Sequence, residues 1–200
     1  MKRKISRHDY NMEIPLLSLA VLISAVLAIL FRQQENTKMY AVFKPLTTVL
    51  IIIIGLVIYN KTASDYSVLI IVALLFSLIG DVFLLFKKYF LQGLASFLIA
   101  HICFIIVFTH LYGFDWNPVT LIPLIVFEGV FFSFLRKDLK RYSIPVLVYM
   151  TVIVVMNWQA INLYLNSGRA AFLAIAMGSI LFSFSDSILA YNKFKKPFKT

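Results

Sequence analysis

Seven long apolar stretches, separated by short polar segments, constrain the fold of this chain more than any other feature. About 17–25 helical residues are needed to cross a hydrocarbon core of ~30 Å, and each stretch is of that length. The stretches are apolar on most faces, which predicts α-helices and excludes the alternating strands of a membrane barrel. They are 13–31, 40–59, 67–86, 93–112, 119–135, 143–163 and 170–191. We therefore expect one all-α integral membrane domain over residues 1–200, built as a bundle of seven transmembrane helices.

The composition excludes the soluble alternatives. Hydrophobic residues are 61% of the chain and charged residues 14%, with a mean hydropathy of +0.89. A soluble globule of 200 residues has too much surface to hide this apolar content. The net charge of +10 comes from Lys and Arg residues spread over the ends of the apolar stretches. This spread indicates helix-end anchors facing lipid headgroups, and we expect membrane lipids and no nucleic acid as partners.

The first stretch resembles a signal peptide, but we predict a retained helix. Four basic residues precede it: Lys2, Arg3, Lys4 and Arg7. The stretch is long for a signal sequence and has no small-residue cleavage site. The distribution of Lys and Arg favours an outside N-terminus and an inside C-terminal tail, whereas the four N-terminal charges favour the reverse. The orientation and the oligomeric state stay open, and we expect a multi-pass protein of the plasma membrane.

A few ionisable residues lie inside the apolar stretches. They are Lys44, Asp81, His101, Glu128 and Asp186. A charge near the bilayer centre costs about 2.5–3.5 kcal/mol even on lenient insertion scales, so such residues normally face a partner or a cavity. We expect Asp81, His101 and Asp186 to point into the bundle and to be catalytic. A structural alternative is that the carboxylates and His101 only join helices through hydrogen bonds.

Other polar residues near these stretches are candidates for substrate binding. Lys44 is either a snorkelling anchor or a holder of a lipid phosphate. The remaining candidates for substrate binding are Ser77, Lys88, Glu128 and Ser185. The chain has no metal-ligand spacing, no Gly-x-Ser-x-Gly motif and no phosphate loop. We therefore expect neither a metal nor an organic cofactor.

The segments after Asp81 and Asp186 share a pattern. Both read Asp-x-x-Leu-x-aromatic-x-Lys-aromatic, with Leu84, Phe86, Lys88 and Tyr89 matching Leu189, Tyr191, Lys193 and Phe194. The two aspartates precede helix ends that point to the same side of the membrane. This pattern suggests a four-plus-four parallel duplication, with chance similarity in apolar sequence as the alternative.

Five short motifs in order resemble the YhhN family of polytopic membrane proteins, whose characterised members are lysoplasmalogenases. The motifs are Phe43-Lys-Pro-Leu-Thr47, Ser77-Leu-Ile-Gly-Asp81, Gly93 through His101, Tyr142-x-x-Pro145 leading to Met156, and Gly178 through Asp186. They cover the second to seventh stretches. Family members usually have eight helices, whereas this sequence has seven such stretches.

The resemblance implies cleavage of the vinyl ether bond of a lysoplasmalogen, a single-chain lysophospholipid. The products would be a fatty aldehyde and a glycerophospho-ethanolamine or glycerophospho-choline. Vinyl ethers hydrolyse by slow protonation of the β-carbon, so the reaction needs one carboxylic acid and one ionised group. We expect Asp81, beside apolar residues, to donate the proton, and Asp186 to be ionised beside Ser183, Ser185 and Ser187. His101 would orient the attacking water or shuttle its proton.

Two other function classes fit the same residues. A lipid or small-molecule transporter would also use intramembrane acids at a repeat interface, although the chain has few helix-interrupting Gly or Pro residues at mid-membrane. A non-catalytic bundle would carry both aspartates as structural groups.

Overall fold

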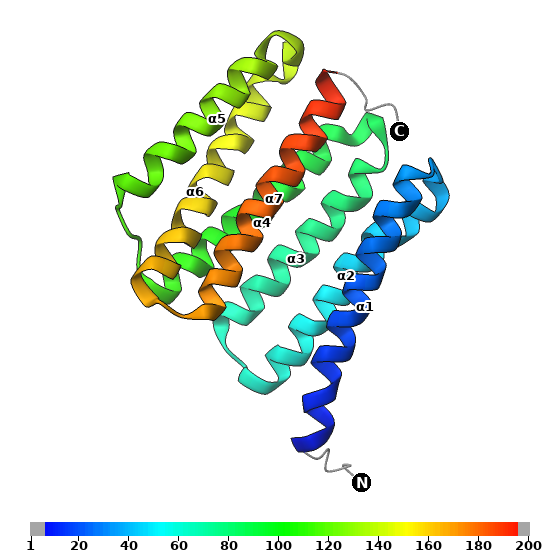
Figure 1. The fold of residues 1–200 in the computed structure, drawn as a ribbon, viewed down its shortest axis with the longest axis vertical. Helices are drawn as coiled ribbons and strands as arrows, with labels where there is room; N and C mark the ends of the chain where they lie inside the picture. The colour runs from blue at the N-terminus through cyan, green and yellow to red at the C-terminus, as the bar shows by residue number, and fades with distance from the viewer. Residues whose placement is uncertain (1–6, 196–200) are drawn as a thin grey trace. The chain divides into compact units, whose positions relative to one another are not determined.

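The computed structural model describes residues 7–195, with side chains from residue 13 onward. These residues form seven α-helices and two short 3-10 turns, without β-strands, so the predicted all-α fold is confirmed. The helices are α1 (Arg7–Gln33), α2 (Thr37–Thr62), α3 (Asp65–Leu84), α4 (Phe90–Tyr112), α5 (Pro118–Leu139), α6 (Ser143–Ser167) and α7 (Ala170–Phe194) (Figure 1). The terminal charges used for the orientation lie outside the described side chains: Lys2, Arg3, Lys4, Arg7, Lys196 and Lys199.

Most helices extend beyond the apolar stretches that predicted them, because polar residues continue a helix into the interface until a turn residue ends it. Residue Ala63 ends α2 in the left-handed conformation, with a φ of 43°. Gly168 ends α6 in the same way, with a φ of 63°. The predicted end of α3 was wrong in the opposite sense, because the apolar stretch runs to residue 86 whereas α3 already ends at Leu84. A 3-10 turn over Lys87–Tyr89 follows.

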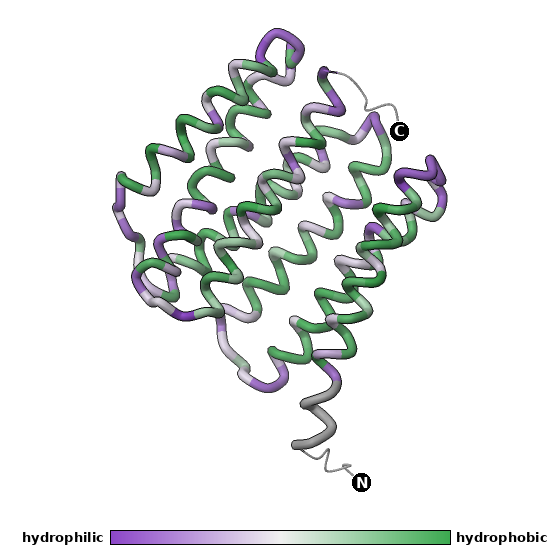
Figure 2. Tube along the Cα trace, viewed as in Figure 1, coloured by the Kyte–Doolittle hydropathy of each residue, from purple (hydrophilic) through white to green (hydrophobic). Residues whose placement is uncertain are grey.

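Six helical segments of the described chain are long and apolar enough to cross a membrane. One of them, Pro118–Ser167, contains both α5 and α6, joined by the 3-10 turn Lys140–Tyr142. Its 50 residues far exceed the ~17–25 that one crossing requires. Lys140 has a φ of 47°, which interrupts the helix at this polar turn (Figure 2). Six segments and seven helices thus describe the same chain.

The chain divides into two compact units, Met1–Ala100 and His101–Lys199. In the first unit α2 packs against α1 and α3, which run antiparallel to it (Figure 1). In the second unit α5, α6 and α7 pack against one another, and α6 carries the longest set of buried residues. The helix α4 contributes its first half to one unit and its second half to the other. A single domain over residues 1–200 stays a prediction.

Large apolar side chains remain exposed along the helices. Examples are Leu16 and Leu22 on α1, and Val119 and Ile122 on α5. Figure 2 shows the apolar residues along the helices and the polar ones at the turns. Exposed apolar faces of this extent fit helices whose outer surface meets lipid.

Candidate functional site

Asp81 lies near the end of α3 and is held by two side chains of α2. Its Oδ1 atom is 3.3 Å from the Lys44 Nζ atom, and its Oδ2 atom accepts a hydrogen bond of 2.6 Å from the Thr48 hydroxyl. Asp81 is buried, with 9% of its surface exposed. Because Lys44 and Thr48 are four residues apart, they lie on the same face of α2. The ammonium forms an ion pair with the Asp81 carboxylate, and the hydroxyl donates a hydrogen bond to it.

A second polar cluster fixes the turn of α2 that carries Lys44. The buried Ser24 of α1 donates a hydrogen bond of 3.2 Å to the Phe43 carbonyl. Thr47 donates to the Ser24 hydroxyl at 2.9 Å and to the same carbonyl at 2.9 Å. Pro45 follows Lys44 directly and lacks the N–H that would continue the helical ladder. The three side-chain bonds therefore stabilise α2 where its own ladder is interrupted.

Close packing against α4 positions the backbone beside Asp81. A Cβ atom at Gly80 would lie 2.5 Å from the ring of Phe97, so this aromatic side chain packs directly on the α3 backbone. A Cβ atom at Gly93 would lie 2.7 Å from the Leu84 side chain and 3.4 Å from the Gly80 carbonyl oxygen. The Ser96 hydroxyl donates to the Phe76 carbonyl at 2.6 Å. Small residues at Gly80 and Gly93 thus allow the close contact between α3 and α4.

Two predicted substrate-binding residues of the first unit have other contacts. Ser77 is buried and donates its hydroxyl to the Ala73 carbonyl, one turn back in α3, at 3.0 Å. Lys88 is exposed in the 3-10 turn, with its Nζ atom 4.6 Å from the ring centre of Tyr89. Neither contact tests a role in substrate binding.

Asp186 lies on α7 in the second unit, and one of its polar partners comes from α6. The Tyr149 hydroxyl donates a short hydrogen bond to the Oδ2 atom of Asp186. Tyr149 is buried, and Asp186 is half-buried. The Glu128 carboxylate of α5 is close enough to Asp186 for the two charges to interact. The second unit therefore brings two carboxylates and a phenol together.

The serines near Asp186 do not supply the hydroxyl donors that we expected. Ser183 donates to the Ser179 carbonyl at 3.0 Å, and Ser187 donates to the Ser183 carbonyl at 2.9 Å. A serine hydroxyl within a helix commonly bonds the carbonyl one turn back, which explains the error. Ser185 is exposed on α7. Tyr149 replaces the serines as the donor to Asp186.

His101 is buried in the second unit, with 2% of its surface exposed. Its ring meets two aromatic rings edge to face: Tyr149, with ring centres 5.4 Å apart, and Phe182, at 5.0 Å. The first of these partners is the phenol that donates to Asp186. His101 thus belongs to the same side-chain cluster as Tyr149 and Asp186.

Asn157 is a buried polar residue of α6 that the sequence did not single out. Its Nδ2 atom donates a hydrogen bond of 2.6 Å to the Ser183 hydroxyl. Its Oδ1 atom is buried and has no hydrogen-bond partner among the described residues. A buried acceptor of this kind normally requires a donor from water or a ligand.

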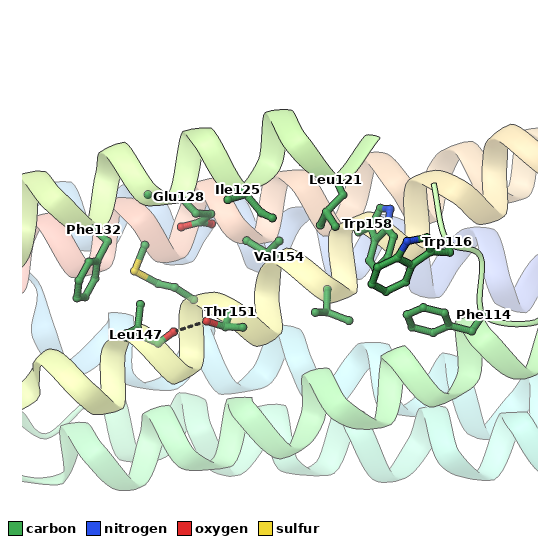
Figure 3. A pocket seen from close by; sticks show the side chains of 13 residues that line it. Phe114, Trp116, Leu121, Ile125, Glu128, Phe132, Leu147, Thr151, Val154 and Trp158 are labelled. Atoms are coloured by element: carbon green, nitrogen blue, oxygen red, sulfur yellow. Dashed lines mark hydrogen bonds between the residues drawn. The ribbon is translucent and has the colours of Figure 1, made fainter. Parts of the chain in front are cut away.

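Glu128 lies in an open groove between α5 and α6 with a volume of about 450 Å³ (Figure 3). Aromatic residues gather at one end of the groove, where the ring centres of Trp116 and Trp158 are 5.2 Å apart. Glu128 is the one charged residue of the lining. The other lining residues are Phe114, Trp116, Leu121, Ile125, Gly129, Phe132, Leu147, Met150, Thr151, Val154, Val155 and Trp158.

Two partners of the candidate carboxylates, Thr48 and Tyr149, were not predicted from the sequence. Both are hydroxyl residues on apolar helices, and each contacts a carboxylate on another helix. The family motif that contains Lys44 ends at Thr47, one residue before Thr48. Among the side chains described, those of residues 13–195, no three His, Cys, Asp or Glu side chains gather into a group that could hold a metal ion.

Comparison with known protein families gives one match, which covers most of the chain. The model of the YhhN family matches residues 39–200. This region includes Lys44, Asp81, His101, Glu128 and Asp186.

Curated relatives include proteins named as lysoplasmalogenases. A "Lysoplasmalogenase homolog" of Dictyostelium discoideum is 30% identical over 66% of this chain and 52% of its own length. The human "Lysoplasmalogenase TMEM86B" is 28% identical over 68% of this chain and 55% of its own length. The "Uncharacterized membrane protein YhhN" of Escherichia coli O157:H7 is 26% identical over 90% of this chain and 86% of its own length. The chain spans about half the length of the relatives named as lysoplasmalogenases, and no solved structure matches it.

Proposed function

This chain belongs to the YhhN family, and from that membership we propose that it is an intramembrane hydrolase that cleaves the vinyl ether bond of lysoplasmalogens. One observation carries the proposal: within this family, the chain holds carboxylates with specific partners at membrane depth. Asp81 is paired with Lys44 and Thr48, and Asp186 accepts a hydrogen bond from Tyr149. Relatives of similar sequence carry the name lysoplasmalogenase.

The proposed reaction needs one proton donor and one ionised carboxylate. An acid transfers a proton to the β-carbon of the vinyl ether, which leaves an oxocarbenium ion at the α-carbon. Water adds to that carbon and loses a proton to the ionised carboxylate, giving a hemiacetal. The hemiacetal collapses to a fatty aldehyde and a glycerophospho-ethanolamine or glycerophospho-choline whose first hydroxyl is now free, so one water molecule is consumed. These are the roles that a pair of carboxylates in different environments can share.

The contacts favour a distribution of these roles opposite to the one expected from the sequence. Lys44 and Thr48 stabilise the charged form of Asp81, so we assign Asp81 the part of the ionised carboxylate. Asp186 lies near a second carboxylate, Glu128, and two neighbouring carboxylates repel each other when both are charged. A state in which only one of the two carboxylates is ionised relieves that repulsion. We assign the proton donor to Asp186, where the charge of Glu128 opposes the hydrogen bond from Tyr149 that favours the anion.

His101 and Lys44 have proposed supporting roles. His101 packs edge to face on Tyr149, and we assign it the positioning of the Asp186 cluster and of the attacking water. Lys44 stabilises Asp81, and its ammonium is also suited to bind the phosphate of the lysolipid. Glu128, Ser77, Lys88 and Ser185 remain proposed contacts of the substrate.

The test is release of fatty aldehyde from lysoplasmenyl-ethanolamine by the purified full-length protein. The matched control substrate is the saturated 1-O-alkyl lysolipid, which lacks the double bond that accepts the proton. We expect aldehyde from the vinyl ether substrate and none from the saturated one. If the wild-type protein releases no more aldehyde than the double variant Asp81→Asn/Asp186→Asn, the proposal is wrong.

A further inference from the structure

We propose that the groove between α5 and α6 binds the hydrocarbon chain of a single-chain ether lysolipid, with Glu128 contacting the polar end of that chain. This inference rests on the proposed function and extends it, because it places the substrate chain on one face of the second unit. The groove volume of about 450 Å³ falls within the range of ligand pockets, roughly 300–1,000 Å³.

The groove walls are suited to a hydrocarbon chain. All lining residues other than Glu128 and Thr151 are apolar, aromatic or glycine. The Thr151 hydroxyl donates to the Leu147 carbonyl at 2.9 Å, and the Trp158 indole donates to the Asn117 carbonyl at 2.8 Å. These two donors are therefore satisfied within the protein. An apolar chain in the groove leaves neither of them unpaired.

Glu128 distinguishes this groove from an ordinary lipid-facing surface. Among the residues that the structure describes, Glu128 has no hydrogen-bond or ion-pair partner, and Asp186 is its charged neighbour. A carboxylate at membrane depth requires a donor or a cation. The free glycerol hydroxyl beside the ether of a lysolipid is such a donor, whereas the ester oxygens of a two-chain phospholipid only accept hydrogen bonds. The contact with Glu128 therefore favours a single-chain lipid.

The position of Glu128 also connects the groove with the proposed proton donor. Figure 3 shows Glu128 along the groove, between the aromatic cluster of Trp116 and Trp158 and the ring of Phe132. In a lysolipid whose hydroxyl meets Glu128, the ether oxygen is three bonds from that hydroxyl oxygen and the vinyl carbon is four, and Asp186 is the charged neighbour of Glu128. The chain would then lie along the apolar wall.

Three variants test the occupant of the groove. A Cβ atom at Gly129 meets no atom within 4 Å, so the first added carbon has room, and Gly129→Leu adds four carbons at the groove wall. Val155→Phe adds four carbons from the opposite wall. The control is Val130→Phe, which adds four carbons at a residue that is 67% exposed and outside the lining. Leu replaces Gly within a helix at no cost in propensity, and thermal unfolding of all three proteins verifies that they fold.

The readout is independent of hydrolysis, because both tryptophans of the chain line the groove. The probe is a non-hydrolysable 1-O-alkyl lysophosphatidylethanolamine with a dibrominated chain, which quenches tryptophan fluorescence on contact. The protein is placed in nanodiscs of unbrominated diacyl phospholipid. We expect saturable quenching for wild type and Val130→Phe, and at least a fivefold weaker apparent affinity for Gly129→Leu and Val155→Phe.

Two results would overturn the inference. Equal quenching curves for all four proteins would show that the chain binds elsewhere. Equal quenching by a dibrominated diacyl phospholipid at the same concentration would show that the groove does not select a single chain. Failure of the hydrolysis assay together with saturable, variant-sensitive quenching would overturn the proposed function and support the groove. The two proposals can therefore fail separately.

Discussion

Asp81 and Asp186 occupy equivalent places in their helices, yet their surroundings differ. Asp81 lies sixteen residues after Asp65, the first residue of α3, and Asp186 lies sixteen residues after Ala170, the first residue of α7. Each aspartate has a partner on the preceding helix of its own unit. The partner of Asp81 is the Lys44 ammonium, and that of Asp186 is the Tyr149 phenol. Equivalent positions of two helices thus carry aspartates with different partners. The carboxylate of Asp81 lies beside a cation, and that of Asp186 beside a neutral hydrogen-bond donor.

The equivalent positions of Asp81 in α3 and Asp186 in α7 support the proposed parallel duplication. The different partners of the two aspartates suggest how one of them could act as a base and the other as an acid. A carboxylate beside an ammonium is stabilised as an anion, which suits a base. A carboxylate near a second carboxylate gains from holding a proton, which suits an acid. The repeated Asp-x-x-Leu pattern in the sequence does not reveal this division, because the partners lie on other helices.

The largest effects are expected when either carboxylate loses its charge. Asp81→Asn and Asp186→Asn keep the side-chain size but cannot exchange a proton, so each should lower kcat/KM by at least about 10²-fold. The double variant should lose little more than the worse single variant, because both residues serve one reaction. Aldehyde release measures all three. Full activity in one single variant would remove that residue from the acid–base mechanism.

The pH dependence of the same variants tests which carboxylate is the acid. A reaction that needs Asp81 ionised fails at low pH, and one that needs Asp186 protonated fails at high pH, so kcat/KM of the wild type should be bell-shaped. In the pH profile of the residual kcat/KM, Asp81→Asn should no longer show the fall at low pH. Asp186→Asn should no longer show the fall at high pH. The opposite assignment of the limbs would restore the roles expected from the sequence.

A smaller effect is expected from Lys44→Gln. Without the ammonium, the carboxylate form of Asp81 is less stable, so the acid limb should move to higher pH and kcat should fall about tenfold. The control is Lys38→Gln, an exposed residue of the same helix with the same loss of charge. An increase in KM with unchanged kcat and unchanged acid limb would instead assign Lys44 to the lipid phosphate alone.

The corresponding change in the second unit is Tyr149→Phe. It removes a hydroxyl that stabilises the anion of Asp186, so the alkaline limb should move to higher pH while the acid limb stays in place. We expect a loss of kcat of only a few-fold, because the acid itself remains. Tyr164→Phe, on the same helix α6, is the matched control. Movement of both limbs would indicate that Tyr149 does not act on Asp186 alone.

The sequence predicts the candidate residues better than it predicts their partners. Asp81, His101 and Asp186 stand out because charged or ionisable groups are costly in lipid. Thr48 and Tyr149 do not stand out, since hydroxyls are common on membrane helices and the chain alone does not tell which helices pack together. The serines near Asp186 misled the prediction because their hydroxyls bond carbonyls of their own helix.

The helices themselves follow from the apolar stretches, whereas their ends do not. Hydropathy indicates where the apolar, lipid-facing residues end. A helix, however, continues through polar residues until the backbone leaves the helical conformation. Ala63 and Gly168 provide such turns in the left-handed conformation, beyond the predicted ends of α2 and α6. The 3-10 turn at Lys140 is another example, since it separates α5 from α6 within one helical segment.

The smallest expected effect concerns the residues that precede the two aspartates. Gly80 precedes Asp81 and lies against the Phe97 ring, whereas Ser185 precedes Asp186 and is exposed. Gly80→Ala would place a Cβ atom 2.5 Å from that ring, so Phe97 or the helix must shift. Overpacking of this kind costs about 1–3 kcal/mol, and an exposed substitution usually changes the free energy of unfolding by less than about 0.5 kcal/mol. Thermal unfolding should therefore show a lower Tm for Gly80→Ala and an almost unchanged Tm for Ser185→Ala. Equal Tm values for the two variants would mean that α3 packs as loosely before Asp81 as α7 does before Asp186. The two aspartates would then differ in their polar partners but not in the packing of the preceding residue.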